Sequence, residues 1–494
     1  MRDERLVLGF FAFHLLVAAP GLALMYALGL VRPRPVALAA AAGPAFVIGL
    51  VVVGVPLIAL VVLGVTVGTP ASLAVLAVLT LGLGLAALRR HQRERQVLAG
   101  VGSAAARPPV VELVVERLVL AATAGYLALG SLAFAHVPTM WDDANIWSLK
   151  GLALYYHEGL IDGVARNSQL SGVHLDYPIL QPLLEASFFR AIGGVDLRLW
   201  HVELWVLFAA LLWTLAWLLA PLGKRWLWTL VLATLSVSGI LITNITLGDA
   251  DTTMAGLVGC ATLSFGIWLE RGQRSHALLG ALFIAGAANV KNEGLAFGVA
   301  IGVALVLVVA LGRVRGRWKD LALSAAVVAG GVLPWQLWVL GNEAATRATP
   351  SPWQVVDDPG YLLDRSEFLW RGIEQIVLQL TNTAEWGLLV PALLVVATVL
   401  LVVRRQRTLV SFYLLAALLA SLSVAYTYWV TPFADLGGFE SRTGPRIVLG
   451  IVFAVGAGLA HLLQLAISAT PSDEADSHAV EDPPRAEPRV EARA

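Results

Sequence analysis

The sequence predicts an all-α protein that crosses a membrane many times. Of its 494 residues, 58% are hydrophobic and only 14% are charged, whereas soluble domains carry about 25% charged residues. Apolar runs of roughly 20 residues, the length that crosses a bilayer as a helix, recur from end to end. The single cysteine, Cys260, lies inside such a run, which excludes a disulfide framework. The net charge of zero gives no sign of a nucleic-acid partner.

About thirteen membrane-spanning helices are predicted along the chain. They cover residues 6–30, 36–66, 71–88, 112–135, 199–220, 226–247, 252–269, 277–290, 295–312, 320–340, 385–403, 408–427 and 446–467. No small-residue cleavage site follows the first of them, so we expect a retained helix rather than a signal peptide. We divide the chain into a three-helix membrane module (1–110), a transmembrane core (111–468) and a disordered cytoplasmic tail (469–494) rich in proline and charge.

Basic clusters orient these helices, because arginine and lysine gather in short cytoplasmic loops. Five clusters fall on one side if the spans alternate: RRHQRER (89–95), GKR (223–225), ERGQR (270–274), RVRGRWK (313–319) and RRQR (404–407). We therefore place the N-terminus outside and the tail inside. Residues 178–193 would break this alternation if they crossed. We expect a re-entrant or interfacial helix there, with Glu185 and Arg190 reaching water.

Four polar clusters then share the extracytoplasmic side. They are WDD (141–143) with the long loop 137–198, LGDAD (247–251), VKNEG (290–294) and ESRTGPR (440–446). A second outer loop is predicted at 341–384, long enough to act as a lid or to recognise an acceptor. The stretch DDANIWSLKGLALYYHEG predicts an amphipathic helix in the interface, with Trp147 and Tyr156 as headgroup anchors.

The acidic pairs in these clusters have two interpretations each. Asp142 and Asp143 are either a charged helix end that sets depth in the bilayer, or a general base and cation ligand at its lip. Asp249 and Asp251 are either ordinary acids at a helix N-terminus, or part of a shared site with a divalent cation near Asp142 and Asp251. A divalent cation is the one cofactor that the sequence suggests.

The basic residues on this side also have two interpretations each. Lys291, Asn292 and Glu293 interrupt an apolar run at a depth where charges are costly. Lys291 is either half of a structural ion pair or the partner of a lipid-linked phosphate. Arg442 and Arg446 bind either lipid headgroups or that phosphate. The histidines show no metal-binding spacing, and the chain has no P-loop, GxSxG or GxGxxG in a strand–helix context.

These motifs resemble, over about 112–450, the GT-C superfamily of polytopic glycosyltransferases. The nearest branch is the bacterial one related to protein mannosyltransferases, aminoarabinose transferases and the RgtA/B/C/D-like domain. WDDANIWSLK is similar to its WD-x4-W-x2-K pattern, with Asp142, Trp147 and Lys150 at the matching positions. DYPILQPLLEA, which carries Asp176 and Tyr177, GDADTTMA and KNEGL resemble later elements of the branch. The late loop lacks the histidine expected there.

The resemblance implies an inverting transferase that moves a sugar from a polyprenyl-phosphate donor to an extracytoplasmic acceptor, which is a glycan, lipid or protein. Asp142, with Asp143 as the second choice, would be catalytic. The implied substrate-binding residues are Lys150, Asp176, Tyr177, Asp249, Asp251, Lys291, Asn292, Glu293, Arg442 and Arg446. The arginine- and alanine-rich composition indicates a GC-rich bacterial genome, hence the bacterial cytoplasmic membrane. A transporter or flippase of a lipid-linked or small anionic substrate, and an O-antigen-ligase-like enzyme, are the alternatives.

Overall fold

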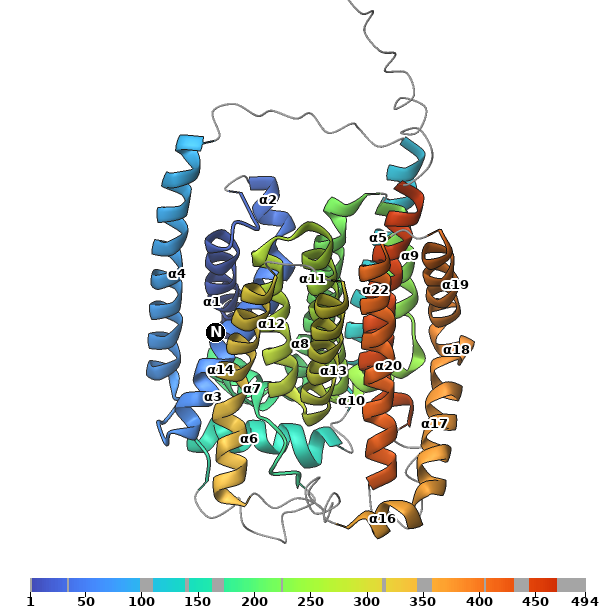
Figure 1. Ribbon diagram of the computed structural model, residues 1–494. Coiled ribbons are helices and arrows are strands. Elements are labelled where there is room, and N and C mark those ends of the chain that lie inside the picture. Colours follow the sequence, from blue (N-terminus) through green and yellow to red (C-terminus); the bar gives the residue numbers. More distant parts are fainter. Residues whose placement is uncertain are drawn as a thin grey trace, which may run out of the picture.

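The computed structural model describes residues 2–32, 35–97, 110–137, 142–161, 173–223, 225–312, 317–343, 358–403, 406–430 and 444–468. Within these ranges the chain contains helices and no strand. Ten helices are long and apolar enough to cross a membrane, or up to twelve if each of two bent pairs is one span. The chain is thus an all-helical protein of the polytopic membrane type, and Figure 1 shows these helices as one bundle.

The helices run in chain order as follows. They are α1 (Arg2–Ala27), α2 (Pro35–Ala40), α3 (Ala42–Val62), α4 (Thr69–Val97), α5 (Val110–Phe134), η1 (Asp143–Trp147), α6 (Ser148–His157), α7 (Leu180–Ile192), α8 (Leu197–Leu219), η4 (Ala220–Leu222), α9 (Arg225–Ser236), α10 (Gly239–Leu247), α11 (Asp251–Arg271), α12 (Arg274–Val290), α13 (Asn292–Leu311), α14 (Trp318–Asn342), α16 (Pro359–Asp364), α17 (Ser366–Leu380), α18 (Thr383–Trp386), α19 (Leu389–Val402), α20 (Arg407–Val430) and α22 (Leu449–Ser468).

The predicted count of thirteen spans is not reproduced, for three local reasons. The predicted span 277–290 is α12, whose 17 residues are fewer than the roughly 20 that cross a bilayer. The span 226–247 is broken into α9 and α10 with a bend of 58°. The span 385–403 begins inside a second bent pair, α17–α18 and α19, with a bend of 105°. Bends of this size come from capping residues that the apolar pattern alone does not reveal.

The helix α11 lies at the centre of the bundle and carries Asp251 at its first position. The whole of its span is buried, and it packs against α8, α12, α20 and α22. Small residues permit this, since helices in membranes approach closely through glycine and alanine. A Cβ at Gly266 would overlap the Tyr413 hydroxyl, and one at Gly259 would press on Phe453. The bundle therefore holds the start of α11 rigidly at one end.

Several expectations for the loops are corrected. The predicted re-entrant segment 178–193 is α7, a helix of 13 residues packed inside the protein, too short to span. Glu185 is completely buried and does not reach water. Trp147 is 1% exposed, so it is not a headgroup anchor, whereas Tyr156 is exposed. The predicted loop 341–384 contains the helices α16 and α17 and the first half of α18. The tail 469–494 lies outside the described residues.

The helices α1 and α3 of the predicted N-terminal module pack directly on the core. The helix α3 contacts α7, α8, α12 and α14, and α1 contacts α7. A buried polar contact joins α1 to α8, where His14 Nε2 lies 3.0 Å from the Glu203 carboxylate. The module thus belongs to the same bundle as the predicted core.

Candidate functional site

Segments far apart in the sequence meet at one end of the bundle, the lower end in Figure 1. They are the start of η1, the turn between α10 and α11, the break between α12 and α13, and the residues just before α22. Six of the predicted site residues make direct ionic contacts there, and we call them the ionic cluster: Asp142, Asp249, Asp251, Lys291, Glu293 and Arg446. The described residues of the four predicted polar clusters therefore lie together at one end of the bundle.

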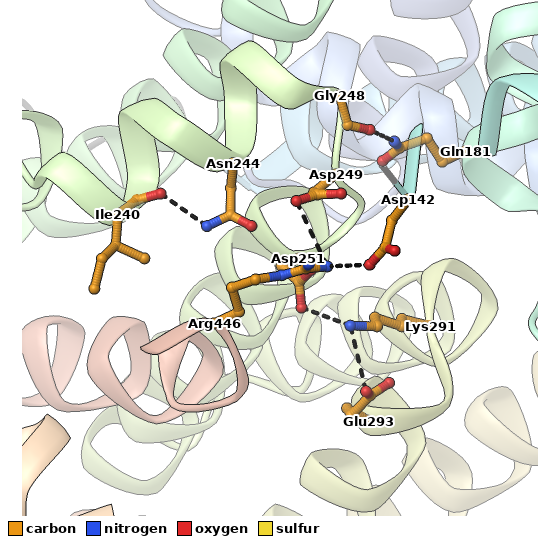
Figure 2. A network of polar contacts seen from close by, with 10 residues as sticks. All are labelled: Asp142, Gln181, Ile240, Asn244, Gly248, Asp249, Asp251, Lys291, Glu293 and Arg446. Atoms are coloured by element: carbon orange, nitrogen blue, oxygen red, sulfur yellow. Dashed lines mark hydrogen bonds and ion pairs between the residues drawn. The ribbon is translucent and has the colours of Figure 1, made fainter. Parts of the chain in front are cut away.

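Arg446 lies between three carboxylates, as Figure 2 shows. Its guanidinium Nη2 is 2.9 Å from Asp142 Oδ2 and 2.8 Å from Asp251 Oδ2. The Asp249 carboxylate is 3.5 Å away. The Arg446 side chain is 22% exposed and that of Asp142 43%, while Asp249 and Asp251 are buried. Because the buried acids need a cation nearby, Arg446 holds them together and leaves Asp142 as their accessible member.

Lys291 approaches Asp251 from the other side. It lies between α12 and α13 in extended backbone (φ −154°), which turns its side chain out of both helices. Its Nζ is 2.7 Å from Asp251 Oδ1 and 3.3 Å from Glu293. Asp251 therefore has a cation on each of its two oxygens. A carboxylate held in this way is ionised and fixed in orientation.

The loop that carries Asp176 and Tyr177 packs over Lys291. Asn292 donates a hydrogen bond of 2.9 Å to the Asp176 carboxylate. Lys150 donates to the carbonyl of Tyr177 at 3.1 Å and also to that of His174. The Tyr177 ring has Lys150 and Lys291 at 6.0 and 5.9 Å from its centroid, within the range of cation–π contacts. Lys150 thus holds the loop backbone, rather than facing the ionic cluster.

Asp143 belongs to a second, fully buried group with Ser148, Glu185 and His201, which we call the buried acid group. Asp143 accepts a hydrogen bond of 2.8 Å from Ser148 and lies 3.8 Å from His201 Nε2. Its carboxyl packs against Gly248, where φ is +77° and an added Cβ would overlap it. Neither oxygen of Glu185 has a hydrogen-bond partner among the described residues. Of the two adjacent acids, only Asp142 is exposed to solvent.

Burial changes the protonation of several groups beside the cluster. It raises the pKa of Asp249 to about 7, although the charge of Arg446 opposes the shift. It lowers the pKa of Lys150 to about 7, against the opposing charge of Asp176. It also raises the pKa of Asp143, while His201 and Ser148 lower it. Asp249 and Lys150 are therefore poised to exchange protons near neutral pH.

The ionic cluster brings together four carboxylates and two positively charged side chains. Among the described residues, no three histidine, cysteine, aspartate or glutamate side chains are placed to hold a metal ion. The Arg446 guanidinium also fills the space between Asp142 and Asp251, where a divalent cation was expected. Its positive charge would repel a second cation placed between these two carboxylates.

One small cavity borders the cluster, and an apolar groove lies at the opposite end of α10. A cavity of about 10 Å³, the space of one water molecule, is bounded by Asp249, Thr252 and Thr253. An apolar groove of about 560 Å³ runs between α5 and α9 and is lined by residues such as Leu118, Tyr126 and Val237. Val237 lies just before α10, whose far end leads into Asp249.

The sequence predicted all six residues of the ionic cluster, but not the residues that hold them in place. Eleven of the twelve predicted residues lie at or beside this end, and Arg442 lies outside the described residues. Gln181, which donates to the Gly248 carbonyl at 3.0 Å, was missed, as were His201 and the role of Gly248. The sequence signal that could have indicated Gln181 and His201 is a polar residue inside an apolar run. Comparison with family models, curated proteins and solved structures finds no match to this chain.

Proposed function

We propose that the protein is an integral membrane glycosyltransferase that moves a sugar from a polyprenyl-phosphate donor to an acceptor on the extracytoplasmic side. The observation that carries this proposal is the position of Arg446, which lies between an accessible carboxylate and two buried ones. A guanidinium in this place pairs with a phosphate through two parallel hydrogen bonds. The apolar groove between α5 and α9 supports a donor with a long hydrocarbon chain.

In the proposed mechanism, Arg446 exchanges Asp142 for the donor phosphate when the donor binds. The phosphate takes the guanidinium face that Asp142 holds at 2.9 Å, and Lys291 stands behind Asp251 as a second positive charge. Asp142 is freed by this exchange and becomes a base that faces the acceptor. Asp251 stays in place, because it accepts from Arg446 and Lys291 at once.

The proposed reaction is an in-line displacement at the anomeric carbon. Asp142 accepts the proton of the acceptor hydroxyl while that oxygen forms a bond to the anomeric carbon. The bond from this carbon to the phosphate oxygen breaks, and polyprenyl phosphate leaves with the electron pair. Arg446 and Lys291 stabilise the charge that develops on the leaving phosphate. One displacement inverts the anomeric centre, and no covalent enzyme intermediate forms.

The test is sugar transfer by the full chain in proteoliposomes that contain labelled polyprenyl-phosphate sugars and candidate acceptors. We expect Asp142→Asn to lower kcat by about 10²- to 10⁴-fold, the usual contribution of a general base. Glu374→Ala, which removes an exposed acid from α17, is the control and keeps full activity. Activity of Asp142→Asn near that of the wild type would remove Asp142 from the base role. Movement of the labelled lipid across the bilayer without transfer would favour a transporter instead.

A further inference from the structure

The two broken spans of the bundle meet at a single acidic side chain, Glu385. It lies on α18, next to the 105° bend that precedes α19. Its Oε2 accepts a hydrogen bond of 3.0 Å from the Ile240 backbone N–H and one of 3.2 Å from Ser238 Oγ. Both donors belong to the start of α10, at the other bend. The contact therefore joins residues 145 and 147 positions apart.

The contact satisfies the first turn of α10, whose N–H groups have no partner within the helix. Ser238 caps Leu241 N–H at 3.4 Å, and Glu385 takes the N–H of Ile240. A carboxylate is stabilised at the positive end of a helix dipole. Glu385 is half-buried and follows the polar residues 381–383, and its carboxylate reaches α10 from a separate helix. Helix capping alone does not require this residue, since Ser238 already supplies a cap.

The C-terminal end of α10 leads directly into the ionic cluster. The helix has nine residues, a length of about 13 Å. It ends at Gly248, whose carbonyl accepts from Gln181 and whose Cα faces the Asp143 carboxyl. Asp249 and Asp251 follow directly. The helix α10 is thus a short strut that is held at both ends and carries two acids of the ionic cluster at its exit.

We propose that Glu385 is a positioning residue that sets, through α10, the place of Asp249 and Asp251 beside Arg446. It touches none of the reacting groups and acts on them only through the strut. This inference rests on the proposed function for its catalytic consequence, but its structural part is independent of that function. The end of α10 that leads into Asp249 and Asp251 is thereby linked to the helices α17–α19, which pack against α20 and α22.

The structural part is tested by amide hydrogen exchange of the full chain in lipid nanodiscs. Glu385→Ala is compared with Glu385→Gln, whose amide oxygen still accepts from Ile240, and with Glu374→Ala on the neighbouring α17. We expect faster exchange from Ile240 through Asp249 in Glu385→Ala only. The inference is overturned if exchange in this stretch matches the wild type, or if faster exchange stops within the first turn of α10. Equal defects in both Glu385 variants would overturn it as well.

The catalytic part uses the transfer assay with the same variants. We expect Glu385→Ala to lower kcat roughly 10- to 100-fold, the effect of misplacing a supporting group by about 1 Å, with KM for the donor nearly unchanged. Glu385→Gln recovers most of the rate. A normal kcat in Glu385→Ala overturns the inference. Absence of transfer in the wild type refutes the proposed function alone, because the exchange experiment still decides whether Glu385 holds the strut.

Discussion

Two adjacent aspartates belong to regions of opposite character. Asp142 lies in the ionic cluster, where Arg446 and Lys291 supply positive charge and a path to the surface remains open. Asp143 lies in the buried acid group, where Asp143 and Glu185 have only His201 as a basic neighbour among the groups that shift their pKa values. In the first region two cations stabilise the ionised form of Asp251, whereas the second region favours protonated carboxyl groups.

Two adjacent acids in one helical turn thus have different surroundings. Successive residues in a helical turn point in different directions, so one carboxylate faces Arg446 and the other faces Gly248. The region with cations has exchangeable partners and suits binding and catalysis. The region without them has fixed partners and suits support. Substitutions in the two regions should therefore differ in size and in pH dependence.

The largest effect is expected at Arg446. Arg446→Ala leaves Asp249 and Asp251 with less positive charge in a buried place, and removal of one partner from such a pair costs about 3 to 5 kcal/mol. We expect a loss of stability in this range and loss of transfer, measured by denaturant unfolding in detergent and by the transfer assay.

The control for Arg446 is Arg371→Ala, which breaks an exposed pair with Glu367 one helical turn away. Such a pair contributes about 0.5 kcal/mol or less. Equal effects at the two arginines would contradict the view that burial gives the ionic cluster its strength.

A smaller effect is expected where the two regions touch. Gly248 has a positive φ and its Cα faces the Asp143 carboxyl. Gly248→Ala should cost about 2 kcal/mol through backbone strain, plus a displacement of Asp143, and thermal unfolding measures the loss. Gly302→Ala in α13 is the matched control, since an added Cβ there meets nothing within 4 Å. It should stabilise the helix by about 0.5 kcal/mol.

The smallest effect is expected at Glu185, and it depends on pH. Burial, and then the charge of Asp143, raises the pKa of Glu185 well above its ordinary value of 4.5, while Ser148 opposes the shift. The folded protein keeps this proton after the unfolded chain has lost it. The wild type therefore loses stability as pH rises from about 4.5 toward the raised value. Glu185→Gln, which has no proton to lose, should gain thermal stability relative to the wild type between pH 4 and pH 8.

The same pH series with Glu374→Gln gives the reference, because that acid is exposed on α17. It should follow the wild type at every pH. A constant difference between Glu185→Gln and the wild type across the range would show that Glu185 is ionised in the folded protein, and the contrast between the two regions would fail.

Much of the fold was predictable because membrane helices leave a strong apolar signal. Ten predicted spans correspond to long helices, and the polar clusters fall at one end as the alternation of spans requires. The breaks at Ser238 and Gly387 were not predicted, since the apolar runs 226–247 and 385–403 as a whole keep a high mean hydropathy across them. A cap depends on one side chain or one backbone angle, and hydropathy averages over both.

The candidate site was predictable in its members and not in its pairing. Asp251, Lys291 and Arg446 stand out because charges are rare in this sequence. That Arg446 bridges Asp142 and Asp251 depends on contacts across 304 and 195 positions of the chain. Glu385 was not among the predicted residues, because its partners are a serine and a backbone N–H, and neither leaves a pattern in the sequence.

The sequence by itself determined the membrane class, the alternation of the helices and the set of charged residues that gather at one end, because hydropathy and charge act locally. Tertiary structure alone decided which acid meets Arg446, which one is buried beside Glu185, and which side chain holds α10. These choices depend on the direction of a side chain within one helical turn and on close packing between distant helices. Asp142 and Asp143 carry the same chemistry, and only the packed bundle gives them different surroundings.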